Sequence, residues 1–169
     1  MNTLLVTGGG QKGYIAFHDV RKFSKKGSSS EFYMIDHHKK SINAAYVSPD
    51  GEYLVSVSQD NTVKVVKNYM DKTSSTFSLR HDNFTGRWLS TFRPCFDPKA
   101  PSTFVLGSME HPRVVEVFSP TIIRDVLSLH RDAVLKSEFL GSVCSRNAFH
   151  HDLHLIAGCN SSGRVHIFR

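Results

Sequence analysis

Apolar and polar side chains alternate along nearly the whole chain, and this alternation limits the fold more than any other feature of the sequence. In Tyr53–Val57, Thr62–Val66 and Val114–Phe118 the apolar residues recur with a period close to two, which places them on one face of a β strand. Stretches that could form a long amphipathic helix are hard to find. The chain is therefore predicted to be all-β, with about fourteen short strands, of which Leu89–Phe92 is the eighth.

Turn residues divide these strands into units of similar length. The clearest unit runs from His38 to Leu79, where Ser48-Pro-Asp-Gly51 and Asp60-Asn61 separate successive strands, as residues of these types do in tight turns. The units recur at roughly 45 to 50 residues, the interval of four-stranded propeller blades. The sequence therefore predicts a partial β-propeller of about three and a half blades.

The unit from His38 to Leu79 has the pattern of a WD repeat. His38 lies shortly before the first strand, Ser56 and Ser58 lie on the second, and Asp60 lies in the turn after it. Val66-Lys67 stands where Trp-Asp is usual. In this pattern a buried histidine, serine and aspartate are joined by hydrogen bonds, so we expect His38, Ser58 and Asp60 to have a structural role.

The strands are too few for a closed ring. Propellers typically have four to eight blades, whereas the predicted strands begin inside one blade and end inside another. The open sheet edges would accept strands from elsewhere. We expect residues 1–169 to be the C-terminal portion of a longer WD-repeat propeller, with the missing half supplied in the same polypeptide or by another chain.

Several stretches are more specific than a generic WD repeat. Residues 81–92, 104–113, and 140–146 with 160–168 resemble the WD-repeat protein 76 family, chromatin-associated propellers that include the fungal DNA damage-binding WD-repeat protein. More distantly, residues 42–51 and the blade after them are similar to the WD-repeat subunit of the UV-damaged-DNA-binding complex. The resemblance covers nearly the whole chain. It implies a nuclear protein that binds DNA or chromatin in the DNA damage response.

An excess of positive charge favours an anionic partner. Lys and Arg number 21 against 15 acidic residues, a net charge of +6. In a WD propeller the loops between blades share a face with the turns between second and third strands, and much of this charge falls in them, with Lys12, Arg131 and Lys136 among its members. Such a face suits phosphate contacts. The candidate DNA contacts are Lys39, Lys40, Arg80, His81, Asn83, Arg87, Trp88, His111, Arg113 and Arg164.

The loop from Arg80 to Trp88 is the sharpest candidate within this face. Arg80 and Arg87 could hold phosphates, Gly86 permits a tight tip, and Phe84 or Trp88 could stack on a base. In the UV-damage subunit the corresponding region resembles a hairpin inserted at a lesion, although the tip residues differ here. The alternative, and the expectation for Trp88, is that both aromatic side chains pack under the loop.

A second candidate lies on the opposite face. The stretch Tyr14 to Arg21 resembles the motif by which WD proteins dock on the adaptor of the cullin-4 ubiquitin ligase, with His18 in place of the usual tryptophan. Asp19 and Arg21 would carry that contact, since an arginine can bind a partner in a bidentate manner. The alternative function is therefore a protein-only scaffold or a substrate receptor of this ligase.

Catalytic, metal and membrane functions have little support. The glycine-rich stretch Gly8–Gly13 lacks the order of a phosphate-binding loop. The histidines around His151 have no partner at zinc-ligand spacing except Asp152. No apolar run approaches the roughly 18 to 20 residues of a membrane span. We expect a non-catalytic binding module with no cofactor and no metal.

Overall fold

Short antiparallel strands make up most of the computed structural model, which describes residues 4–9, 13–22, 31–71 and 73–169. Lys12, one member of the expected basic face, lies outside these residues. The described part contains fourteen strands and one short 3-10 helix, so the prediction of an all-β chain is confirmed. No described helix is long and apolar enough to span a membrane. The elements are β1 (Leu4–Gly9), β2 (Tyr14–Asp19), η1 (Val20–Lys22), β3 (Glu31–Asp36), β4 (Ile42–Val47), β5 (Tyr53–Ser58), β6 (Thr62–Lys67), β7 (Ser75–Arg80), β8 (Cys95–Asp97), β9 (Ala100–Gly107), β10 (Val115–Ile123), β11 (Val126–Leu135), β12 (Cys144–Phe149), β13 (Ile156–Asn160) and β14 (Val165–Phe168).

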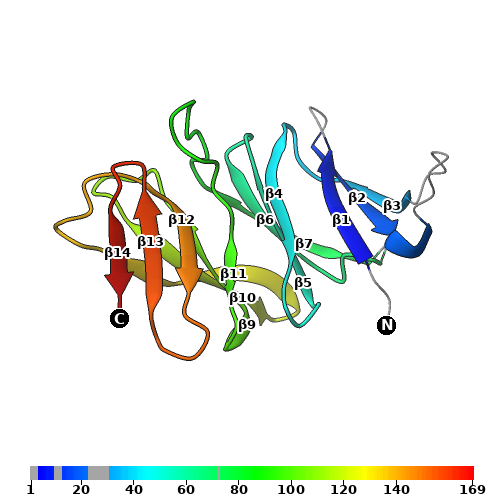
Figure 1. Cartoon of the computed structure of the whole chain (residues 1–169). Coiled ribbons are helices and arrows are strands. Elements are labelled where there is room, and N and C mark those ends of the chain that lie inside the picture. Colours follow the sequence, from blue (N-terminus) through cyan, green and yellow to red (C-terminus); the bar gives the residue numbers. More distant parts are fainter. Residues whose placement is uncertain (1–3, 10–12, 23–30, 72) are drawn as a thin grey trace.

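The strands form four sheets in which each strand pairs with its neighbour in sequence. The described residues give sheets in the orders β1-β2-β3, β4-β5-β6-β7, β8-β9-β10-β11 and β12-β13-β14. The sheets stand side by side like successive blades (Figure 1), with β1 against β4, β7 against β11, and β12 against β8 and β9. The predicted partial propeller is therefore confirmed, with two blades of four strands and two of three.

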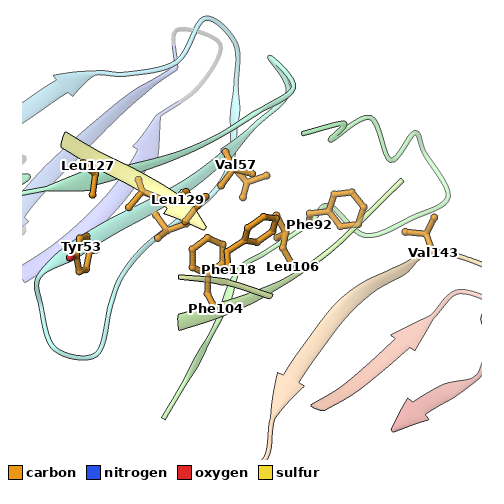
Figure 2. Close-up of a cluster of buried hydrophobic side chains, with 12 residues drawn as sticks. Tyr53, Val57, Phe92, Phe104, Leu106, Phe118, Leu127, Leu129 and Val143 are labelled. Carbon is orange, nitrogen blue, oxygen red and sulfur yellow. The ribbon is translucent and has the colours of Figure 1, made fainter. Parts of the chain in front are cut away.

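Hydrophobic clusters fill the three spaces between neighbouring sheets. On β5, Val55 and Val57 point into the cluster shared with the third sheet, whereas Leu54 joins the cluster shared with the first. Successive side chains of a strand point to opposite faces, so the whole of β5 is buried. Phe104 and Phe118 from the third sheet lie beside these valines in the central cluster (Figure 2), with ring centroids 5.6 Å apart.

One predicted strand is wrong. Leu89–Phe92 pairs with no strand, and the inner strand of the third sheet is β8, which begins after Pro94. Phe92 is fully buried in the central cluster. Its burial comes from a loop that enters the core, and apolar spacing alone does not distinguish such a loop from a strand.

β10 and β11 form a long hairpin, in which β10 continues past Phe118, the predicted end of its strand. β9 pairs with β10 only from Val115 to Phe118, so the rest of the hairpin extends beyond the sheet. Arg124 and Asp125 form its turn with positive φ angles of 49° and 63°. The buried Leu127 and Leu129 fold this extension back onto the central cluster near Tyr53 (Figure 2).

Two glycines allow adjacent sheets to approach closely. Gly13 has a φ of +68°, and its carbonyl accepts hydrogen bonds from the backbone N–H groups of His37 and His38, at 3.3 and 2.8 Å. A Cβ atom at Gly107 would overlap the carbonyl oxygen of Cys144, where the fourth sheet begins. Glycine at these positions sets the spacing of the blades.

Candidate nucleic-acid interface

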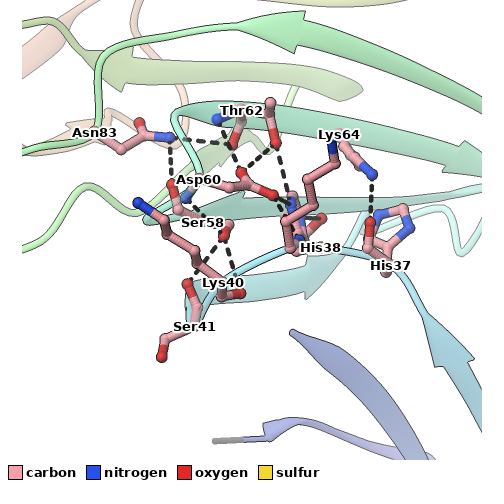
Figure 3. Close-up of polar contacts among 11 residues, drawn as sticks. His37, His38, Lys40, Ser41, Ser58, Asp60, Thr62, Lys64 and Asn83 are labelled. Atoms are coloured by element: carbon pink, nitrogen blue, oxygen red, sulfur yellow. Dashed lines mark hydrogen bonds and ion pairs between the residues drawn. The ribbon is translucent and has the colours of Figure 1, made fainter. Parts of the chain in front are cut away.

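A polar network holds the second blade together at the end where its connecting loops lie (Figure 3). The two ring nitrogens of His38 contact Asp60 Oδ2 at 3.1 Å and Ser56 Oγ at 2.8 Å. The Thr62 hydroxyl donates to Asp60 Oδ1 at 2.6 Å. Ser58 also belongs to the network, because its Oγ accepts the Asp60 N–H at 3.2 Å and donates to the carbonyls of Lys40 and Ser41. The network ties the loop before β4 to the turn between β5 and β6.

Burial fixes the charge states in this network. It lowers the pKa of His38, so the ring is neutral at physiological pH. Burial also acts to raise the pKa of Asp60, but hydrogen bonds from Thr62 and the Lys39 N–H outweigh it and lower the value to about 2. Because an ionised carboxylate only accepts hydrogen bonds, His38 Nδ1 carries the proton toward Asp60 and Nε2 accepts from Ser56.

The neighbouring His37 is also neutral. Its side chain is buried, and burial together with the nearby His38 and Lys64 lowers its pKa to about 3. Lys64 Nζ donates to the His37 carbonyl. These two buried histidines therefore add no positive charge to the surface.

The base of the loop after β7 is tied to the same turn. Asn83 Nδ2 donates to the carbonyls of Ser58 and Thr62, at 2.8 and 3.0 Å (Figure 3). His81 Nδ1 contacts Asn83 Oδ1 at 2.7 Å. Both side chains are buried, at 6% and 2% exposure, so the expectation that His81 and Asn83 contact DNA is wrong. They anchor the loop.

His81 also links this loop to the third blade. Its Nε2 lies 3.4 Å from Glu116 Oε2, and Arg131 Nη1 donates to Glu116 Oε1 at 2.8 Å. Burial acts to raise the pKa of Glu116, but the contacts with His81 and Arg131 outweigh it and lower the pKa. Arg131 is thus committed to an internal carboxylate and contributes little to the basic face.

The tip of the loop is open to solvent. Trp88 is 91% exposed and Phe84 is 76% exposed, so the expectation that these aromatic side chains pack under the loop is wrong. Arg87 lies beside Trp88 and is exposed, and Gly86 turns the tip with a φ of +65°. The core position expected for Trp88 belongs to Phe92. The loop therefore presents two aromatic rings and a cation.

The remaining candidate contacts divide into two groups. Lys39, Lys40, Arg80, His111 and Arg164 are exposed. Arg113 is half-buried, and its Nη1 donates to the Met109 carbonyl at 2.6 Å.

The loops before β4, between β5 and β6, and after β7 lie at one end of the sheets, the upper edge of Figure 1. Lys40 and Arg87 line one hollow there.

The second candidate site, Asp19 and Arg21, lies at the other end of β2 from Gly13. Arg21 donates from Nε to Asp19 Oδ1 at 2.8 Å and from Nη2 to Oδ2 at 2.6 Å. This bidentate contact raises the pKa of Arg21. The arginine side chain is nonetheless 63% exposed. The pair is a neutral ion pair at the surface in which Asp19 holds the exposed guanidinium in one position.

The family signature begins in the last strand of the first sheet and continues through most of the second sheet. Residues 29–67 match the model of the WD domain, G-beta repeat. The match takes in β3 to β6, includes the His38 and Asp60 network, and ends at Lys67, where the aspartate of the repeat usually stands. The chain is a WD-repeat protein.

Curated relatives share the name WD repeat-containing protein 76, which confirms the resemblance found in the sequence. This WD-repeat protein is 37% identical to the Xenopus laevis protein over 159 residues, and 38% identical to the Mus musculus protein over 154 residues. The alignments cover 92% and 89% of this chain but 26% and 24% of the relatives. The chain thus spans about a quarter of their length.

A solved structure supports the fold. The β-propeller domain of Cps50 (Swd1) from Myceliophteria thermophila matches 98% of this WD-repeat protein with a TM-score of 0.64. The sequence identity is 17%, so the match bears on the fold alone. The chain covers 49% of that propeller domain.

The sequence analysis missed two residues of the candidate interface. Asn43 and Gln59 line the same hollow as Lys40 and Arg87. Asn43 interrupts the apolar start of β4, and the register shift there marks a β-bulge between Ile42 and Ala44. A polar residue that breaks the alternation of a strand is the signal that could have identified it.

Proposed function

We propose that this WD-repeat protein is a non-catalytic module that binds DNA or chromatin in the nucleus, in the DNA damage response. The observation that carries the proposal is the loop tip, where the exposed Phe84 and Trp88 accompany Arg87. Cations hold phosphates while an aromatic ring stacks on a base. The damage response and the nucleus follow from the resemblance to DNA damage-binding WD-repeat proteins.

The anchoring of the loop supports this function. Asn83 and His81 tie the base to the second and third blades, so the tip needs less ordering when a ligand binds. Pre-organisation of this kind lowers the entropic cost of binding. Lys39, Lys40 and Arg80 extend the positive surface beside the loop. Together these groups suit a polyanion with exposed aromatic bases.

Fluorescence anisotropy with a labelled DNA duplex across a salt series tests the proposal. For wild type, the logarithm of the association constant should fall steeply and linearly with the logarithm of the salt concentration. Arg87→Gln should lower the salt slope by about one and weaken binding to all sequences alike. Arg124→Gln, at the distant hairpin turn, is the matched control and should change neither. Loss of affinity in both variants, or in neither, would contradict the role of the loop.

Trp88 tests stacking separately from charge. Trp88→Ala should weaken binding by about 1 to 3 kcal/mol and leave the melting temperature unchanged, because the ring is 91% exposed. Phe139→Ala removes an aromatic ring of 68% exposure from another loop and should leave the affinity at the wild-type value. A large fall in melting temperature on losing Trp88 would show that the ring supports the fold instead.

The fixed Asp19–Arg21 pair favours a second function, docking on the adaptor of the cullin-4 ubiquitin ligase. Asp19 uses Nε and Nη2 of Arg21, but the side chain is 63% exposed, so a partner can reach the remaining N–H groups of a guanidinium that is already held in place. Arg21→Ala should abolish capture by immobilised adaptor while the melting temperature stays unchanged, since exposed ion pairs contribute little stability. Equal capture of wild type and the variant would remove this function.

A further inference from the structure

Asn43 is a buried donor that the fold leaves without an acceptor. In the register of β4 and β5, Ile42 pairs with Ser58 and Ala44 pairs with Val57, so Asn43 is the extra residue of a bulge. Bulges re-aim side chains and are common beside functional sites. The Asn43 Nδ2 atom is buried and has no hydrogen-bond partner. Such groups are rare in folded proteins and call for an explanation.

Asn43 is among the residues that line a hollow at the proposed DNA-binding surface, here named the Asn43 hollow. Its volume is about 380 Å³, and its lining includes Lys40, Gln59, Thr85 and Arg87. None of the described residues that line it is acidic. Within the described part of the chain, Lys40 and Arg87 form no ion pair. The hollow thus combines two unpaired cations with an unused buried donor.

The surroundings favour one class of anion. Phe84, 76% exposed, also lines the hollow. The nearby Asp82 is outside the lining, and its carboxylate accepts the Phe84 N–H at 3.0 Å. A group that carries negative charge, several acceptor oxygens and an adjacent flat ring would satisfy Asn43, the two cations and the aromatic side chain together. A phosphate in a nucleic-acid strand has these properties, whereas a carboxylate of an acidic peptide lacks the ring.

We infer that the Asn43 hollow binds one backbone phosphate of a nucleic-acid strand. Rotation of the Asn43 side chain brings Nδ2 from its buried position into the hollow, where it donates a hydrogen bond to a phosphate oxygen. Lys40 and Arg87 provide the opposing charge, and Phe84 stacks on the adjoining base. The inference rests on the proposed DNA-binding function and names the part of the ligand that this surface selects. Asn43 contributes to binding through a hydrogen bond that exists only in the complex.

The test removes the donor without removing an internal contact. Asn43→Leu has a similar size, and the Nδ2 donor has no internal bond to lose, so the melting temperature should equal or exceed that of wild type. Binding to a labelled oligothymidylate without terminal phosphates should weaken about tenfold. Tyr46→Leu places the same residue at an exposed position of β4 and should bind as wild type does. Asn43→Asp keeps the shape, repels a phosphate and should weaken binding further.

Three outcomes separate this inference from the proposed function. If wild type binds DNA and both Asn43 variants bind equally well, phosphate binding in the hollow is refuted while the proposed DNA-binding function stands. If wild type binds no DNA, the proposed function fails, and inorganic phosphate is titrated against the Asn43 side-chain amide signal in an NMR spectrum. A saturable shift of that signal supports an anion site in the hollow, and an unchanged signal overturns it.

Discussion

Substitution of Gly107 by alanine should separate the third and fourth blades. A Cβ atom there would lie far inside 3.0 Å of the Cys144 carbonyl oxygen and 2.8 Å from Phe92 Cε1. The first obstacle is backbone at the start of β12, so no side-chain rotation can relieve the overlap. Overpacking typically lowers the free energy of unfolding by 1 to 3 kcal/mol. Because the obstacle here is backbone, we expect a loss of about 3 kcal/mol. For a chain of this size that corresponds to a fall in melting temperature of roughly 6 to 12 °C.

The same substitution at Gly141 provides the control. No atom lies within 4 Å of a Cβ there, and its φ is outside the left-handed region. Gly141→Ala should therefore be neutral or stabilise the fold by about 0.4 to 1 kcal/mol, by restricting the unfolded chain. Both variants are measured by urea denaturation, with hydrogen exchange to locate the change. The reasoning is refuted if Gly107→Ala unfolds within about 1 kcal/mol of Gly141→Ala, or if β12–β14 exchange as in wild type.

Two further predictions concern pH and association. Folding lowers the pKa of His37 from 6.5 to about 3. Below pH 6.5 the unfolded state therefore binds more protons than the folded state, and stability falls as the pH is lowered. Between pH 7 and 5 this residue alone should remove about 2 kcal/mol, and His37→Phe should reduce the loss measured by urea denaturation. In the described residues β14 pairs only with β13, and Val165 and Ile167 are 67% and 61% exposed. We expect the 169-residue chain to self-associate through this edge, measured by light scattering, and lysines at both positions to restore the monomer.

Each of these predictions has a clear contrary result. An identical pH dependence in His37→Phe and wild type would show that His37 titrates normally in the folded chain. The contribution of Asp60, whose folded pKa is about 2, is lost only below about pH 4 and does not affect this comparison. A wild-type chain that stays monomeric over a wide concentration range would show that the β14 edge is protected.

The fold could be predicted from the sequence because its cues are local. Alternation of apolar residues and the turns at Ser48–Gly51 and Asp60-Asn61 define strands and hairpins without knowledge of the partners. The Leu89–Phe92 error had a different origin. Its apolar residues are buried through contacts with the core of two blades, and the sequence of the segment does not reveal whether a ladder partner exists.

The candidate site was less predictable because exposure depends on the whole fold. Trp88 and Phe92 are both aromatic residues of one loop, yet one is 91% exposed and the other is fully buried. His81 and Asn83 have side chains that could bind phosphate, but the neighbouring turn and Glu116 occupy them. Residue type indicates what a side chain can bind, whereas the fold decides whether its polar atoms are already used.

Because the interface loop is anchored at its base, the base and the tip differ in how well they tolerate substitution. His81 and Asn83 are held by two blades, so replacing either would disturb the packing of the propeller. Between them and Leu89, the exposed residues Phe84, Arg87 and Trp88 could be exchanged at little cost to folding, whereas Gly86, with its φ of +65°, has to stay. A scaffold of this kind can acquire a new ligand preference by substitution at the tip alone. The loop is therefore the natural position at which to randomise residues when selecting variants with altered binding.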